Sequence, residues 1–232
     1  MATKGKHLLA GSFWGRIGII VFLGYLFSIT SVEAAITVQS FSGGVKVLLK
    51  DESTWKPLPE KIELKAGDQI LTEKGGSVDL LSGDGSTFHL DGETQLAINE
   101  LEFSKPQKTR VSRLKLFWGS LTAKAATLVF NKNVFEVETD TVVAGFRFSS
   151  MTIKAEEGSG TTIIPLDGKL EFKQLEGNTQ VDYTSPEGVV TTYTLPATAQ
   201  VLMDITPDKP FQMTSNVAIP NDAYCGIGTI TF

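Results

Sequence analysis

Cysteine and histidine are nearly absent from this sequence, and their scarcity excludes several kinds of site. The one cysteine, Cys225, cannot form an internal disulfide, so the fold must be held by its core alone. His89 is the only histidine beyond the first few residues. A zinc site needs three or four His or Cys ligands, and these two residues cannot supply one. No G-x-S-x-G elbow accompanies His89, so a nucleophile–base pair is not indicated.

Clustered positive charge is also missing. The formal net charge is −5, and lysines are scattered through the chain. A protein that binds phosphate backbones needs basic residues gathered on one face, so we expect no nucleic-acid partner. The apolar share of 41% is enough for a buried core and excludes a disordered chain.

The N-terminus has the pattern of a signal for export from a bacterial cytoplasm. Basic residues precede the apolar run 17–29, and Val32-Glu33-Ala34 carries small residues where a signal peptidase cleaves. We therefore predict a signal helix over residues 1–34, cleavage between Ala34 and Ala35, and a periplasmic or secreted mature chain. The alternative is an uncleaved anchor, through which alone the protein would contact the membrane. The run is shorter than the roughly 20 apolar residues that span a bilayer.

Helical periodicity is lacking beyond Ala35. Instead, short runs rich in β-branched and aromatic residues alternate apolar and polar positions between Gly, Asp, Asn and Pro, as in 77–80, 86–90, 134–138 and 169–173. Alternation with one buried and one solvated face is typical of antiparallel sheets. The sequence predicts an all-β fold, an antiparallel sandwich or a jelly-roll-like domain of many short strands.

The organisation along the chain is read from breaks in that pattern. The polar segment 99–113 contains a proline and is expected to be an exposed excursion between strands. Repeated prolines loosen the pattern beyond about Leu195. We expect an all-β domain over 36–175 and a C-terminal β extension over 176–232 that packs on the core or trails from it.

Several ordered motifs resemble the FecR-like domain, named after a periplasmic regulator of iron uptake. Residues 64–72 match the pattern L-x-x-G-D-x-I-x-T, and residues 84–90 match D-G-S-x-x-x-L. Residues 114–119 resemble its L-x-L-x-x-G step, and residues 135–139 resemble F-x-V-x-T. The resemblance runs from about Ile36 to Phe172.

The chain departs from the family pattern at one place. Phe148-Ser149 stands where the family has Gly-Thr before its closing strand. Phe does not adopt the positive φ that Gly allows, so we expect ordinary β dihedrals or a different turn there.

The motif residues also have a structural interpretation, which we favour. Asp84-Gly85 is expected to close a tight hairpin with Gly at positive φ, and Asp84→Asn is predicted to be nearly silent. Asp84, Asp91 and Glu93 lie close in sequence, but their spacing is not that of a calcium loop. We therefore assign no catalytic, cofactor-binding or metal-binding residue and expect no cofactor.

The resemblance implies a regulatory role. Founding members of the family sense a loaded outer-membrane receptor and control a sigma factor through a cytoplasmic N-terminal segment. Only about 16 residues precede the apolar run here, so the sigma-factor role is not carried over. We expect an exported, non-catalytic module that binds an envelope protein or polymer.

Two alternatives remain open. The first is a carbohydrate- or peptidoglycan-binding module whose aromatic rings stack on sugars. Phe117 and Trp118 are adjacent and should point to opposite faces of a strand, so at most one could join such a platform. Trp55 and Trp118 are expected to be partly buried over the sheet. The second alternative is an enzyme of unknown type; a glycosidase, for example, would need only two carboxylates at the right distance, and many acidic residues are available.

Overall fold

The computed structural model describes residues 34–127, 132–158, 160–205, 212–215 and 229–231. The predicted signal helix and Cys225 lie outside these residues. The all-β prediction is confirmed, since the described residues form strands and turns without a helix. The strands, all connected in one hydrogen-bonded network, are β1 (Ile36–Ser42), β2 (Val45–Leu48), β3 (Lys56–Pro57), β4 (Glu63–Leu64), β5 (Gln69–Thr72), β6 (Ser77–Ser82), β7 (Thr87–Leu90), β8 (Thr94–Ser104), β9 (Thr109–Lys124), β10 (Lys132–Glu138), β11 (Val142–Glu156), β12 (Gly160–Gln174), β13 (Thr179–Thr184), β14 (Val190–Leu195), β15 (Gln200–Ile205), β16 (Gln212–Ser215) and β17 (Thr229–Thr231).

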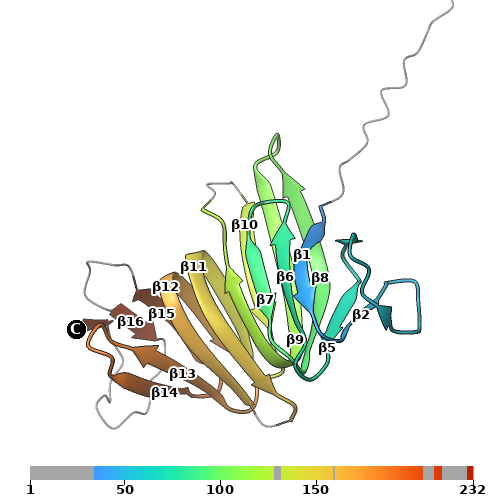
Figure 1. The fold of residues 1–232 in the computed structure, drawn as a ribbon. Helices are drawn as coiled ribbons and strands as arrows, with labels where there is room; N and C mark the ends of the chain where they lie inside the picture. Colours follow the sequence, from blue (N-terminus) through green and yellow to red (C-terminus); the bar gives the residue numbers. More distant parts are fainter. Residues whose placement is uncertain (1–33, 128–131, 159, 206–211, 216–228, 232) are drawn as a thin grey trace, which may run out of the picture. The chain divides into compact units, whose positions relative to one another are not determined.

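Three strands are much longer than the sequence pattern indicates, and each belongs to two layers. β9, β11 and β12 have 16, 15 and 15 residues and lie side by side (Figure 1). The first part of β9 pairs with β8 and β10, whereas its last part pairs with β7 and β11. A bend in each long strand therefore divides the network into two sheets.

The first layer has the order β3-β2-β5-β8-β9-β10-β11-β12-β15-β16-β17, using the early parts of β9 and β11 and the late part of β12. The second layer has the order β4-β1-β6-β7-β9-β11-β12-β13-β14, using the other parts of the three long strands. The residues between the layers form one apolar core.

The layers face each other across aromatic contacts. Phe88 of the second layer stacks on Phe135 of the first, with ring centroids 5.6 Å apart. Phe146 meets Phe135 edge-on at 4.7 Å. Such geometries are favourable for aromatic pairs beyond the area they bury.

Two strand pairs are parallel rather than antiparallel as predicted. β10 pairs with β9 and β13 pairs with β12 in parallel register. The start of β9 lies in the first layer and its end lies in the second. A short link therefore carries the chain from the end of β9 back to the first layer, where β10 pairs with the start of β9. β12 and β13 repeat this arrangement in the opposite direction, so neither pair needs the long crossover of an ordinary parallel pair.

The bend in β9 depends on a glycine. Gly119 has φ +98°, and a bulge precedes it, since Gln95 pairs with Trp118 but Leu96 pairs with Leu116. A Cβ at Gly119 would collide with Thr94. Only glycine combines this dihedral with this close approach.

The bend in β11 contains the departure from the family motif. The pairing of β11 with β12 shifts between Arg147 and Ser150, and β11 continues through Phe148-Ser149 without a turn. Beside it, Ser150 donates a hydrogen bond to Asp167 at the bend of β12, 2.9 Å away. The register shift thus allows β11 to continue as a strand, although Phe148-Ser149 stands in place of the family's Gly-Thr.

The prediction that residues 99–113 form an exposed excursion between strands is wrong. These residues complete β8 and begin β9, joined by a turn that contains Pro106. Arg110 is fully buried, and Val111, Ser112 and Leu114 are almost fully buried. The segment is polar because one face carries ion pairs, including Arg113 to Glu100 and Glu136, and this face is solvated.

Candidate functional site

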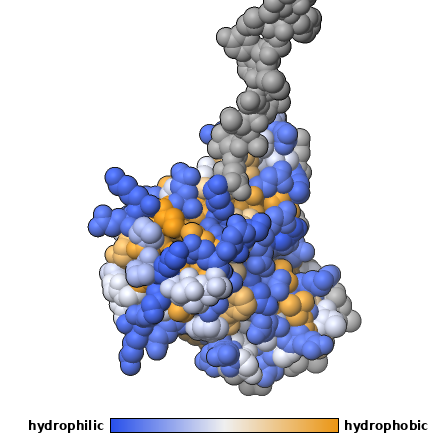
Figure 2. Space-filling view, turned by 90° about the vertical axis from the view of Figure 1, so that its right-hand side faces the viewer, coloured by the Kyte–Doolittle hydropathy of each residue, from blue (hydrophilic) through white to orange (hydrophobic). Residues whose placement is uncertain are grey.

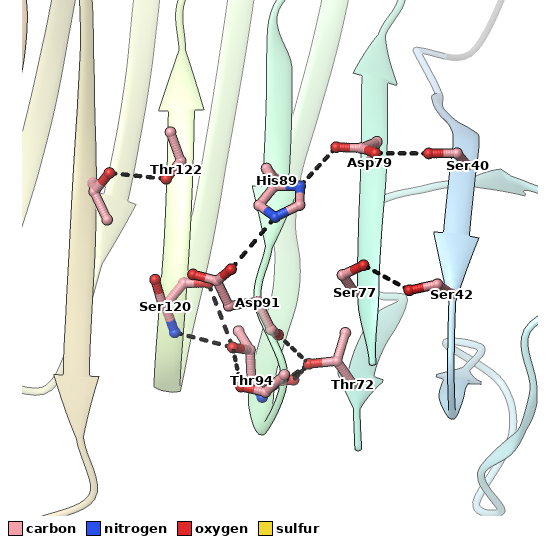
Figure 3. Close-up of polar contacts among 12 residues, drawn as sticks. Ser40, Ser42, Thr72, Ser77, Asp79, His89, Asp91, Thr94, Ser120 and Thr122 are labelled. Atoms are coloured by element: carbon pink, nitrogen blue, oxygen red, sulfur yellow. Dashed lines mark hydrogen bonds and ion pairs between the residues drawn. The ribbon is translucent and has the colours of Figure 1, made fainter. Parts of the chain in front are cut away.

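The outer face of the second layer carries a continuous set of polar side chains, mostly small hydroxyls. We call this the hydroxyl face (Figure 3). It consists of Ser40, Ser42, Ser77, Asp79, His89, Asp91, Thr122 and Thr152. Strand alternation turns these residues outward, while their neighbours Val78, Leu80 and Leu90 are buried in the core.

Register aligns five of these residues in one row across five strands. Ser40 lies opposite Asp79, Asp79 opposite His89, His89 opposite Thr122, and Thr122 opposite Thr152. Hydroxyl, carboxylate and imidazole groups in such a row are close enough to hydrogen-bond across strands. Hydrogen bonds join Ser40, Asp79 and His89 in one group and Thr122 and Thr152 in another, so the row is ordered before any partner arrives.

His89 is the centre of the row. Its Nδ1 lies 2.7 Å from Asp79 Oδ1, and its Nε2 lies 3.4 Å from Asp91 Oδ1 (Figure 3). The hydrogen bond to Asp79 raises the pKa of His89, and partial burial only partly opposes it. The hydrogen bond donated by Ser40, together with that of His89, lowers the pKa of Asp79. Both shifts favour a protonated imidazole between two carboxylates.

This geometry does not activate a nucleophile. Ser40 donates its hydroxyl hydrogen bond to Asp79, 2.6 Å away, and not to His89. Both ring nitrogens of His89 already face carboxylates, so neither nitrogen is directed at a hydroxyl. A general base must instead reach the proton that it abstracts.

The geometry is equally unsuited to a metal. Asp79 and Asp91 approach opposite nitrogens of the ring and so do not converge on one point with it. Across the described ranges, no group of three or more His, Cys, Asp and Glu side chains could hold a metal ion.

The acidic residues that lie close in sequence are separated in space. Asp91 is exposed beside His89, and Glu93 adopts φ +57° in the turn before β8. Asp84 instead points inward, with a side chain only 1% exposed. The three carboxylates therefore face different surroundings, although they are close in sequence.

Asp84 closes the predicted turn and also forms a buried ion pair. Gly85 adopts φ +89°, which confirms the predicted hairpin residue, and Asp84 accepts hydrogen bonds from both the backbone N–H and the hydroxyl of Ser86. Asp84 Oδ2 also lies 3.1 Å from Arg110 Nη1. The prediction that Asp84→Asn is nearly silent overlooked this buried ion pair, which nothing local in the sequence reveals.

Arg110 is buried among polar and aromatic partners. It donates to Asn133 Oδ1 at 2.6 Å and to the Ala126 carbonyl at 3.0 Å, and its guanidinium lies 5.6 Å from the Phe135 ring centre. Asp84 belongs to the second layer and Arg110 to the first. Their pair is thus a structural link between the layers, not an accessible site.

The aromatic pair contradicts the expectation from simple alternation. The rings of Phe117 and Trp118 lie 6.3 Å apart at 56°, so these adjacent side chains contact each other. The bulge at this point in β9 interrupts alternation and turns both rings to one side. Trp55 and Trp118 are partly buried, as predicted.

No helix of the described residues is long and apolar enough to cross a membrane. The apolar run 17–29 lies outside them.

Comparison with known proteins agrees with the motifs. The family model described as FecR protein matches residues 68–171. The matched segment runs from just before β5 into β12 and includes His89 with Asp79 and Asp91, Arg110, and the bends of β9 and β11. No curated protein matches the chain. Over residues 68–171 the chain is thus similar to FecR, a family of regulatory, non-enzymatic proteins.

Proposed function

We propose that this protein is a non-catalytic regulatory module that works outside the cytoplasm and docks on an envelope protein through its hydroxyl face. The single observation that carries the proposal is the pre-ordered row from Ser40 to Thr152, in which His89 is locked between carboxylates. A face of this kind recognises a partner through complementary hydrogen bonds and performs no chemistry itself.

The two outer faces of the domain differ in a way that supports this choice. The outward charges of the first layer neutralise one another, as in Lys46–Glu73, Arg113–Glu136 and Lys169–Asp204. The hydroxyl face offers short side chains that lose little rotamer freedom on binding. The side chains of the hydroxyl face therefore lose little conformational entropy when a partner binds.

The surface of the described residues is mostly polar. In Figure 2, hydrophilic residues cover most of the face in view, and apolar residues form separate spots between them. The large apolar side chains that are exposed within the described ranges are few: Leu166, Val189, Val190 and Leu202. Non-obligate interfaces are about as polar as the remaining protein surface, so this surface fits a partner that binds and leaves.

Position-specific photocrosslinking in intact cells tests the proposal. A photoreactive residue at Thr122 or Thr152 should yield one discrete protein adduct, because both positions lie in the row. Glu171, exposed on the first layer, is the matched control position and should yield none. Adducts of equal intensity from both layers would contradict docking at the hydroxyl face. Asp79→Asn should weaken the adduct at Thr122, because it removes the carboxylate that holds the His89 ring in the row.

The carbohydrate-binding alternative gains from one observation. The sequence argument against an aromatic platform assumed that Phe117 and Trp118 point apart, and the bulge in β9 removes that argument. Retention of the chain on insoluble polysaccharide, lost when Trp118 is replaced by alanine, would support this second function.

A further inference from the structure

A cleft lies where three loops of the domain meet, away from the row that contains His89. The turn between β10 and β11, the hairpin between β11 and β12, and the loop between β12 and β13 line it. Its volume is about 330 Å³. Cavities of roughly 300 Å³ and more commonly hold small ligands. We call it the loop cleft.

Below the loop cleft lies a chain of buried threonine hydroxyls. The Thr141 hydroxyl donates to Thr161 Oγ1 at 2.8 Å. Thr139 Oγ1 lies 2.8 Å from Thr161 Oγ1, and Thr179 Oγ1 lies 2.8 Å from Thr141 Oγ1. All four side chains are at most 8% exposed. Because these hydroxyls satisfy one another, the floor is rigid and its shape does not depend on a ligand.

Two glycines let the loops close on this floor. A Cβ at Gly177 would approach Thr141 Cγ2 to 2.9 Å, and a Cβ at Gly160 would approach the Asn178 carbonyl to 2.7 Å. Both distances are shorter than real Cβ contacts, so larger residues would push the loops apart. The cleft is therefore built into the packing of the loops.

The wall of the cleft is aromatic. Phe117 lines it, since the bulge in β9 turns this half-buried ring out of the strand's normal alternation. Bulges commonly re-aim a side chain toward a site. Trp118 supports the ring from the side, with a centroid separation of 6.3 Å.

The rim of the cleft offers hydrogen-bond acceptors. Asp140, Glu156, Glu176 and Asn178 line it, and the described lining contains neither lysine nor arginine. Lys115, just outside the lining, lies 3.1 Å from Asp140, and its Nζ is 5.7 Å from the centre of the Phe117 ring, so it balances one of the three carboxylates. A ligand must therefore donate hydrogen bonds, present an apolar face to a ring and carry no negative charge.

We propose that the loop cleft binds a short saccharide, neutral or amino-bearing, with one sugar ring stacked on Phe117. Sugar hydroxyls donate to carboxylates, which form charge-assisted hydrogen bonds, while the C–H face of the ring packs on the aromatic wall. Anionic saccharides are disfavoured because the three rim carboxylates outnumber the one cation beside them, Lys115. The proposal concerns a second site and does not depend on docking at the hydroxyl face.

Calorimetric titration of the full chain tests the site with three soluble probes. The N-acetylglucosamine tetramer and the glucosamine tetramer should bind, and the galacturonic acid tetramer should not. Phe117→Ala should weaken binding about tenfold, the equivalent of losing one aromatic stacking contact. Phe117→Tyr should bind nearly as the parent. Phe103→Ala is the matched control, because Phe103 is a half-buried phenylalanine on β8 that does not line the cleft.

Each outcome decides the proposal when thermal melts confirm that the variants are folded. A failure of both neutral and amino-bearing probes to bind up to millimolar concentration would overturn it. So would equal affinity in Phe117→Ala and the parent, or a preference for the galacturonic acid tetramer. Photocrosslinking at Thr122 reports on the hydroxyl face independently, so failure of one proposal is distinguishable from failure of the other.

Discussion

Arg110 Nη1 lies 3.1 Å from Asp84 Oδ2, and the two side chains are 0% and 1% exposed between the two layers of the sandwich. An isolated buried charge is costly, because it loses its hydration without compensation. Each residue therefore depends on the other, although 25 residues separate them in the chain.

Asp84→Asn should destabilise the domain by about 3 kcal/mol, because it leaves the buried guanidinium without a counter-charge. Urea unfolding followed by tryptophan fluorescence measures the loss. The double variant Asp84→Asn with Arg110→Met should recover part of that loss, since it removes the orphaned charge as well. A single variant as stable as the parent would mean that the pair contributes no net stability.

Gly119→Ala should destabilise the domain by about 3 kcal/mol. The change places a side chain at φ +98° and drives a methyl group into Thr94. Chemical unfolding curves give the difference in free energy. Gly75→Ala is the control, because Gly75 has φ +72° but open space around its Cβ position, and it should cost only about 1 kcal/mol. Equal losses in the two variants would show that the close packing at the bend of β9 adds nothing.

His89 should titrate above its ordinary pKa of 6.5, because the hydrogen bond to Asp79 stabilises the imidazolium. A folded-state pKa above the unfolded value adds stability that is fully present below the unfolded pKa and is lost as pH rises through the folded pKa. His89→Gln should therefore cost more stability at mildly acidic pH than at alkaline pH. Nuclear magnetic resonance titration of the ring proton measures the pKa directly.

The control for this titration is Asp79→Asn, which should return the pKa of His89 toward 6.5. The Asp79 side of the pair has the opposite sign: its lowered pKa adds stability that is lost as pH falls below about 3.8. The pair thus stabilises most between these limits. An unchanged His89 pKa in Asp79→Asn would refute the role of this hydrogen bond.

Export predicts a defined N-terminus. Protein isolated from the envelope fraction should begin at Ala35, because Val32-Glu33-Ala34 carries small residues at the positions that a signal peptidase reads. Intact-mass spectrometry gives the answer. Replacing Ala34 with a bulky residue such as leucine should block cleavage, and a full-length chain in the envelope fraction of the parent would instead identify an anchor.

Local patterns in the sequence determine much of the second layer and its turns. Alternation over Ser77–Ser82 and Thr87–Leu90 predicts two strands, and Asp84-Gly85 predicts the hairpin between them with Gly85 at positive φ. These features depend on dihedral preferences and on which face of a strand is apolar, and both are properties of neighbouring residues. The hydroxyl side chains that flank His89 are turned outward by the same alternation.

The tertiary structure alone decides the features that join distant residues. Simple alternation predicts Phe117 and Trp118 on opposite faces, but the bulge that pairs Trp118 with Gln95 brings the rings together. Arginine is usually an exposed residue, yet Arg110 is buried in the core, where it pairs with Asp84 and donates a hydrogen bond to Asn133. Register, bends and buried charge pairs arise from contacts between strands far apart in the chain, so only the packing of the two layers determines them.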